Sequence, residues 1–160
     1  MALNTLTVLL VAMLLLVAFQ DLKNRTIHVA LPTMILGLAL TINFQSKELN
    51  FKGACINVIF VLINMVGLVV YYSLKNKTVV NPIDTYIGLG DIVFFLAVTP
   101  LFTLKPFILF FVLGSVFSLI LHKVLLVFKE VKTIPLAGCL ALFLVINIAL
   151  KDLINVDFLF

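Results

Sequence analysis

Long apolar runs separated by short polar connections restrict the fold of this chain more than any other feature. The chain has 160 residues, of which 64% are hydrophobic and 11% are charged, and its mean hydropathy is +1.30. A soluble domain usually has about 45–50% apolar and about 25% charged residues. A helix that crosses a bilayer needs about 20 mostly apolar residues. The sequence therefore predicts an integral membrane protein.

Six of the apolar runs are interpreted as transmembrane helices. Proline at position 106 suits the first turn of a helix, whereas Pro100 is expected to kink or end one. The first run has no basic segment before it and no small-residue cleavage site, so it is taken as a retained helix and not as a signal peptide. We expect an all-α polytopic membrane protein with one transmembrane domain over residues 1–160. Its helices are predicted at roughly Ala2–Gln20, His28–Phe44, Ala54–Leu74, Gly88–Thr103, Pro106–Leu121 and Ile134–Leu150.

The distribution of basic residues predicts the orientation of these helices. The net charge of +4 is scattered in ones and twos, so it does not indicate nucleic-acid binding. Connections after the first, third and fifth helices hold more bases than the opposite side, and the positive-inside rule places them in the cytoplasm. The seven bases of that side are Lys23, Arg25, Lys75, Lys77, Lys123, Lys129 and Lys132, against Lys47, Lys52, Lys105 and Lys151 opposite.

Two carboxylates are expected at the same depth of the membrane under this orientation. Asp21 ends a helix that runs inward, and Asp91 begins a helix that runs outward. An acid at a membrane helix is expensive to solvate and is therefore a candidate functional residue. The depth that they share, although they are 70 positions apart in the sequence, makes the pair the main candidate for a site.

The segment Gly88-Leu89-Gly90-Asp91 places two glycines directly before an acid at a helix start. Glycine permits positive φ angles and close approach of another chain. Asp91 would lie in the first turn, where the helix dipole favours a negative charge. Taken alone, the pattern describes a flexible turn with an acidic N-cap equally well.

Asp21 alone is best explained as an interfacial acid balanced by Lys23 and Arg25. Paired with Asp91, it becomes a candidate catalytic group, because two neighbouring carboxylates cannot both ionise cheaply and share a proton. One can then deprotonate a water while the other protonates the carbonyl oxygen or the leaving amine. Such hydrolysis needs no metal and no cofactor, and we expect neither. The two titrations belong to the pair, so acid and base roles are not assigned.

Other catalytic chemistries have weaker support in the sequence. His28 and His122 lie at helix boundaries, without a cysteine or serine expected at the matching depth, and the cysteines at 55 and 139 show no C-x-x-C spacing. Hydroxyls within a span, such as that of Ser115, usually bond the backbone or a neighbouring helix. No metal-ligand spacing is present. The segment Ile134-Pro135-Leu136-Ala137-Gly138 opens the sixth helix on the cytoplasmic side, where proline followed by small residues allows close helix approach.

Together these motifs resemble the type IV prepilin peptidase family of Gly-x-Gly-Asp aspartic membrane proteases. Asp21-Leu22-Lys23-Asn24-Arg25-Thr26-Ile27 resembles the family's first aspartate and basic turn, with His28 where proline is common, and residues 88–91 match Gly-x-Gly-Asp. Ile134, Pro135 and Gly138 match a late family motif in part. Val93 stands where the family commonly has lysine. The family's N-terminal cysteine-bearing domain has no counterpart here, which implies a short form with peptidase activity alone.

The resemblance implies an aspartic endopeptidase with Asp21 and Asp91 as its catalytic pair. Its substrates would be prepilin-like proteins, whose short basic leader is cut at the cytoplasmic surface of a bacterial or archaeal cytoplasmic membrane. Two alternatives stay open. One is a presenilin-like intramembrane protease, although the Tyr-Asp element of those enzymes is missing, because Ser73 follows Tyr71-Tyr72. The other is a non-catalytic membrane subunit or small transporter, which should place polar groups near mid-membrane.

Overall fold

The predicted all-α fold is confirmed in a computed structural model, which describes residues 2–45, 51–77, 88–128 and 134–154. Every regular element in this part of the chain is helical. Six α-helices follow one another, and a single 3-10 turn, η1, directly follows α4. Their bounds are α1 Ala2–Asn24, α2 Ala30–Gln45, α3 Phe51–Asn76, α4 Leu89–Val98, η1 Thr99–Leu101, α5 Leu104–Phe128 and α6 Leu136–Ile154.

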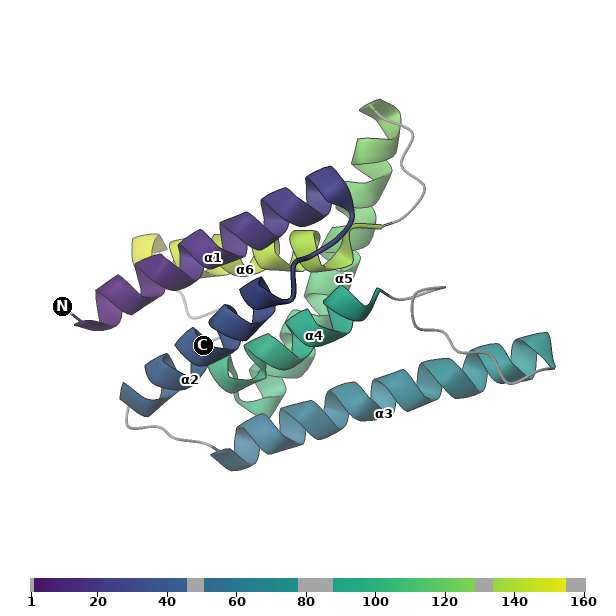
Figure 1. The fold of residues 1–160 in the computed structure, drawn as a ribbon, viewed down its shortest axis with the longest axis horizontal. Coiled ribbons are helices and arrows are strands. Elements are labelled where there is room, and N and C mark those ends of the chain that lie inside the picture. The colour runs from purple at the N-terminus through teal and green to yellow at the C-terminus, as the bar shows by residue number, and fades with distance from the viewer. Residues whose placement is uncertain (1, 46–50, 78–87, 129–133, 155–160) are drawn as a thin grey trace.

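The helices pack so that several of their ends meet on one side of the molecule. α1 packs along α6 in the opposite direction, α2 contacts both α1 and α4, and α5 crosses behind α4 and α6 (Figure 1). α1 ends on the same side on which α2, α4 and α6 begin (Figure 1). The core between them is filled by fully buried phenylalanines and leucines, among them Leu14, Phe94, Phe107, Phe110 and Leu144. This arrangement gathers chain segments from residues 20 to 138 around one small region.

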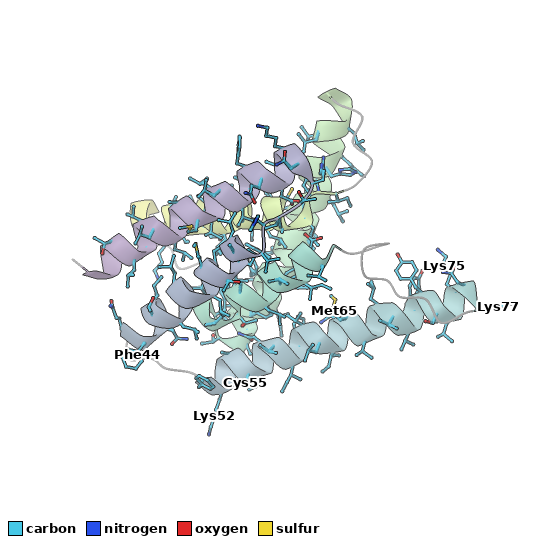
Figure 2. All side chains as sticks on the ribbon, in the orientation of Figure 1. Phe44, Lys52, Cys55, Met65, Lys75 and Lys77 are labelled. Atoms are coloured by element: carbon cyan, nitrogen blue, oxygen red, sulfur yellow. The ribbon has the colours of Figure 1, made fainter. Side chains whose placement is uncertain are left out.

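Three helices are long and apolar enough to cross a membrane by length and composition. They are α1 over Thr5–Asn24, α3, and α5 over Leu104–Leu126. Apolar side chains on their outer faces are exposed, such as Phe19, Ile63 and Leu119, as expected for contact with lipid. Lysines mark both ends of α3, with Lys52 at one end and Lys75 and Lys77 at the other (Figure 2). The protein is therefore membrane-embedded.

α4 is shorter than the sequence predicts, because Pro100 interrupts it. The predicted helix reached Thr103, whereas α4 has ten residues and the chain continues as the 3-10 turn Thr99–Leu101. Ten residues rise about 15 Å, which is half of the hydrocarbon core of a bilayer. α4 is thus too short to cross a bilayer by itself, and Asp91 lies at the end opposite to the turn η1.

Backbone carbonyls at this turn are satisfied by asparagines from two neighbouring helices. Nδ2 of Asn57, on α3, donates to the carbonyl oxygens of Thr99 at 3.1 Å and Phe102 at 2.8 Å. Nδ2 of Asn43, on α2, donates to the carbonyl oxygen of Pro100 at 2.7 Å. Transfer data indicate that leaving a carbonyl group without a hydrogen bond in an apolar medium costs about 2–7 kcal/mol. The two asparagine side chains therefore satisfy carbonyl groups that this non-helical turn would otherwise leave unpaired in an apolar environment.

Of the bases used to predict the orientation, Lys47, Lys129 and Lys132 lie outside the described residues. Lys23 and Arg25 lie at or just after the end of α1, and Lys75 and Lys77 lie at or just after the end of α3. The side on which these bases fall is thus also the side on which α4 and α6 begin (Figure 1).

The close contact between α5 and α6 gives a first testable prediction. A Cβ at Gly114 would lie 2.5 Å from Cδ2 of the buried Leu140. We expect Gly114→Leu to lower the free energy of unfolding by about 1–3 kcal/mol, the usual effect of overpacking. Thermal unfolding in detergent measures it. Gly67→Leu is the matched control, because nothing lies within 4 Å of a Cβ there. Equal unfolding temperatures for the two variants would contradict this packing.

Candidate active site

The N-terminus of α6 lies at the centre of the gathered helix ends. The carbonyl oxygen of Pro135 accepts from the amide of Cys139 at 3.0 Å, which makes Pro135 the N-cap residue of this helix. A proline side chain cannot accept a hydrogen bond, so it cannot cap the amides of the first turn. Those amides need acceptors from elsewhere in the structure.

Asp21 and Asp91 supply these acceptors, one to each of two consecutive residues. The amide of Ala137 donates to Oδ1 of Asp91 at 2.8 Å, and the amide of Gly138 donates to Oδ2 of Asp21 at 2.7 Å. The two carboxylates come from the last turn of α1 and the first turn of α4. The structure therefore brings together two acids that are 70 positions apart, at one helix N-terminus.

Burial and mutual repulsion disfavour the negative charges of the two aspartates, whereas helix dipoles and a nearby arginine favour them. The side chain of Asp21 is buried, at 6% exposed, and its charge is close enough to Asp91 for the two to repel each other. The N-terminal dipole of α6 attracts both charges, and Asp91 also lies in the first turn of its own helix. Arg25 adds a positive charge near Asp21. A pair held in this way can share one proton, as neighbouring carboxylates do.

The glycines around the acids serve close approach and not unusual backbone angles. None of the glycines has a positive φ, and Gly88 has the extended angles φ −69° and ψ 139°. Of the two properties of glycine considered in the sequence, this motif therefore uses close approach and not a positive φ. A Cβ at Gly88 would instead lie 3.1 Å from Oδ2 of Asp91, and one at Gly90 would lie 3.3 Å from Cδ1 of Ile27. At Gly138 it would lie 2.9 Å from the Cβ of Asp21.

The connection between α1 and α2 forms the other wall of the site. Arg25 has the left-handed angle φ 59°, and its amide donates to the carbonyl oxygen of Asp21 at 3.0 Å, so the chain turns sharply after α1. The side chain of Gln20 then accepts from the amide of His28 at 3.1 Å. Residues of this connection, of early α2 and of the start of α4 enclose a pocket of about 250 Å³ that reaches both aspartates. Its lining is mostly apolar, including Ile27, Pro32 and Val93.

A comparison with protein-family models decides the family. Residues 8–122 match the model described as the type IV leader peptidase family, which is most of the chain and includes both aspartates. The chain belongs to the type IV leader peptidase family. Searches of curated proteins and of solved structures return no match. The membership makes the chain a membrane-embedded peptidase that acts on protein substrates.

In this leader peptidase, most of the sequence-predicted site residues come together. Gly88, Gly90 and Gly138 lie against the aspartates or the wall beside them, and Pro135 is the N-cap residue of α6, with its carbonyl oxygen accepting from Cys139. Two others contribute less. Leu89 lines the pocket with a side chain that is half exposed, and Ile134 contributes its carbonyl oxygen, which accepts from Leu136 at 2.9 Å. The catalytic role of the two aspartates stays a prediction at this point.

Two contributors to the peptidase site were missed in the sequence. Ala137 acts through its amide, which no side-chain pattern can reveal. Gln20 precedes Asp21 directly and fixes the turn after α1. A polar residue at the end of an apolar run was its only signal.

Nucleophiles other than the aspartates do not form a second constellation in the described residues. His28 is engaged through its backbone amide, and Ser115 donates to the carbonyl oxygen of Phe111 at 2.6 Å, as expected for a hydroxyl within a span. Cys139 is buried beside Gly138 with its thiol near Ser118, and Nδ1 of His122 is buried without a partner among the described residues. No three histidine, cysteine or acidic side chains in this part of the chain lie together as metal ligands.

The like charges at the site predict that its aspartates reduce stability. Asp91→Asn removes one charge and keeps an oxygen that can accept from Ala137, so we expect the free energy of unfolding to rise by about 1 kcal/mol, within the range of stabilising site substitutions. Thermal unfolding in detergent near neutral pH measures it. Asp91→Leu is the control, because it removes the charge but leaves the Ala137 amide unpaired, and it should gain less. A less stable Asp91→Asn protein would refute the repulsion.

Proposed function

We propose that this protein is an aspartic endopeptidase that cuts the short basic leader of type IV prepilin-like proteins, with Asp21 and Asp91 as catalytic residues. The observation that carries the proposal is the pair of hydrogen bonds from consecutive α6 amides to the two carboxylates. Membership of the type IV leader peptidase family supports the same reaction from independent information.

The hydrogen bonds also indicate which carboxylate oxygens would do the chemistry. Oδ1 of Asp91 and Oδ2 of Asp21 are engaged by α6 amides, and the backbone of Gly88 also hydrogen-bonds the Asp91 carboxylate. The second oxygen of each acid would be the one that meets water and substrate. Gly88 keeps space beside Oδ2 of Asp91, because a side chain there would crowd this oxygen. The glycine motif thus supports access to the proposed catalytic group.

Hydrolysis then needs one proton shared between the two acids. The ionised carboxylate takes a proton from water as the water oxygen attacks the carbonyl carbon of the scissile peptide bond, and the protonated carboxyl donates to the carbonyl oxygen. The bond from carbon to nitrogen breaks as the amine leaves with a proton, and the new carboxyl end keeps the water oxygen. Acid and base roles are not assigned within the pair, because its titrations are coupled.

The place of cleavage follows from the depth of the acids. Asp21 lies at the end of α1 and Asp91 at the start of α4, so the site would face the membrane surface and not its centre. The bases Lys23 and Arg25 on this side favour the cytoplasm under the positive-inside rule. We therefore propose a multi-pass protein of a bacterial or archaeal cytoplasmic membrane, with its active site facing the cytoplasm.

Leader cleavage by membranes that contain the wild type, Asp21→Asn or Asp91→Asn tests the mechanism. We expect the wild type to shorten a prepilin-like substrate, and each variant to insert normally and lose at least about 10³-fold in rate, the size of effect found for triad members. The readout is the size of the substrate on a gel, with membrane insertion measured in parallel. Normal cleavage by both variants would exclude the aspartic mechanism.

Gly138→Ala tests whether the α6 amide must approach Asp21 closely. The new Cβ would lie 2.9 Å from the Cβ of Asp21 and 3.3 Å from the carbonyl oxygen of Ala18, so one of these groups must move. A displacement of about 1 Å in a catalytic group can cost about 10²-fold in rate, and we expect a loss of that order in kcat. Gly37→Ala is the control, because nothing lies within 4 Å of a Cβ there, and it should cleave like the wild type.

A further inference from the structure

We propose that Asn57 is a positioning residue, which holds Asp91 at the α6 amides from the far end of α4. The inference rests on the proposed function, because it assigns Asn57 to the alignment of a proposed catalytic acid. Asn57 itself lies away from the acids, on α3, and acts through the turn at which α4 ends.

The contacts of Asn57 are made to the end of α4 and to the residue after η1. Its side chain is fully buried, and Nδ2 bridges the carbonyl oxygens of Thr99 and Phe102 at 3.1 and 2.8 Å. Both protons of the amide therefore have an acceptor at the turn. This bridge joins the residue that caps α4 to the residue that follows η1.

The remaining atom of the side chain shows that the amide donors are what this position requires. Oδ1 of Asn57 is buried and has no hydrogen-bond partner among the described residues. A buried polar atom without a partner is unfavourable and calls for an explanation. Packing alone would be served better by leucine, which has nearly the same shape and no polar atoms. Retention of an asparagine is explained by the two bonds that its nitrogen makes.

The short length of α4 links these bonds to the site. Eight residues separate Asp91 from Thr99, a rise of about 12 Å in a helix, so a shift at the turn moves Asp91 along the same axis. No side chain caps the N-terminus of α4 at Gly88, so the near end is held by the bond between Asp91 and the Ala137 amide and by the contact of Gly90 with Ile27. Gly90 packs closely against Ile27, so the distance between these two residues measures the position of α4 relative to the α1–α2 connection.

A second asparagine on α3 offers a matched control. Asn64 lies two helical turns after Asn57, and its Nδ2 donates to the carbonyl oxygen of Phe60 in its own helix at 2.8 Å. It therefore holds no other element through this bond. Asn57→Leu and Asn64→Leu make the same chemical change on the same helix, and we expect the first alone to move α4.

Disulfide trapping between α4 and the α1–α2 connection tests the proposal without relying on activity. A Cβ at position 90 would lie 3.4 Å from the Cβ of Ile27, close to the spacing that a disulfide requires. Ile27→Cys with Gly90→Cys reports the position of α4. Asp21→Cys with Gly138→Cys reports the contact of α1 with α6, where the 2.9 Å spacing of the two Cβ positions must widen slightly before a disulfide can form. Both pairs are made in full-length protein in membranes, with Cys55 and Cys139 replaced by alanine.

We expect Asn57→Leu to slow disulfide formation in the 27–90 pair by about threefold or more, because disulfide formation requires a narrow range of Cβ distances and angles. The 21–138 pair should form its disulfide at an unchanged rate. Asn64→Leu should change neither pair. Unchanged trapping of the 27–90 pair overturns the proposal. Equal loss in both pairs also overturns it, because Asn57 would then support the whole fold. Asn43→Leu removes the neighbouring bond to Pro100 and should shift trapping in the same direction, which decides the question if Asn57→Leu inserts poorly.

Cleavage by the same variants, with native residues at the four cysteine positions, connects the shift to catalysis. We expect Asn57→Leu to lower kcat by about tenfold or more with KM unchanged, which is the pattern of an interaction needed in the transition state. Equal kcat for Asn57→Leu and Asn64→Leu overturns the positioning role. If the wild type itself cleaves no prepilin-like substrate, the proposed function fails, and trapping still decides whether Asn57 holds α4.

Discussion

Two backbone amides at the start of α6 are the constraint on which the site depends. Their own helix supplies no side-chain acceptor for them, because its N-cap residue is proline. The carboxylates of Asp21 and Asp91 take that place, and they thereby join α1, α4 and α6 at one point. Two like charges in an apolar setting repel each other, yet the same amides and the helix dipole attract both. The attraction holds the two acids together, and a proton shared between them would reduce their repulsion.

Much of this arrangement could be predicted from spacing and charge. Counting apolar runs gives the helices, and the bases after α1 and α3 give the side on which chain ends meet. That side places Asp21 and Asp91 at equal depth before any contact is known. Pro100 gives the interruption of the fourth run, although the sequence does not say that the helix stops at Val98. These features can be predicted because hydropathy and the effect of proline on a helix depend on the local sequence and not on distant residues.

The contacts that complete the site could not be predicted in the same way. Ala137 contributes an amide that every residue except proline has, so its role leaves no trace in side-chain chemistry. Asn57 and Asn64 look equivalent in the sequence, two turns apart on one helix, and only the packing of η1 against α3 separates them. Glycine at positions 88 and 90 permits either a positive φ or a close approach, and only the structure shows that close approach is what these residues provide. Such roles depend on what lies opposite, which is a property of the whole fold.

The half-length helix α4 also has a consequence for how the chain assembles during synthesis. The turn that ends it has carbonyl oxygens without helical partners, and in an apolar medium no water can donate hydrogen bonds to them. The asparagines that do so belong to α2 and α3, which precede α4 in the chain and leave the ribosome first. Synthesis from the N-terminus thus presents the donors before the acceptors arrive. A circularly permuted chain that made α4 first would have to insert this turn with its carbonyls bare.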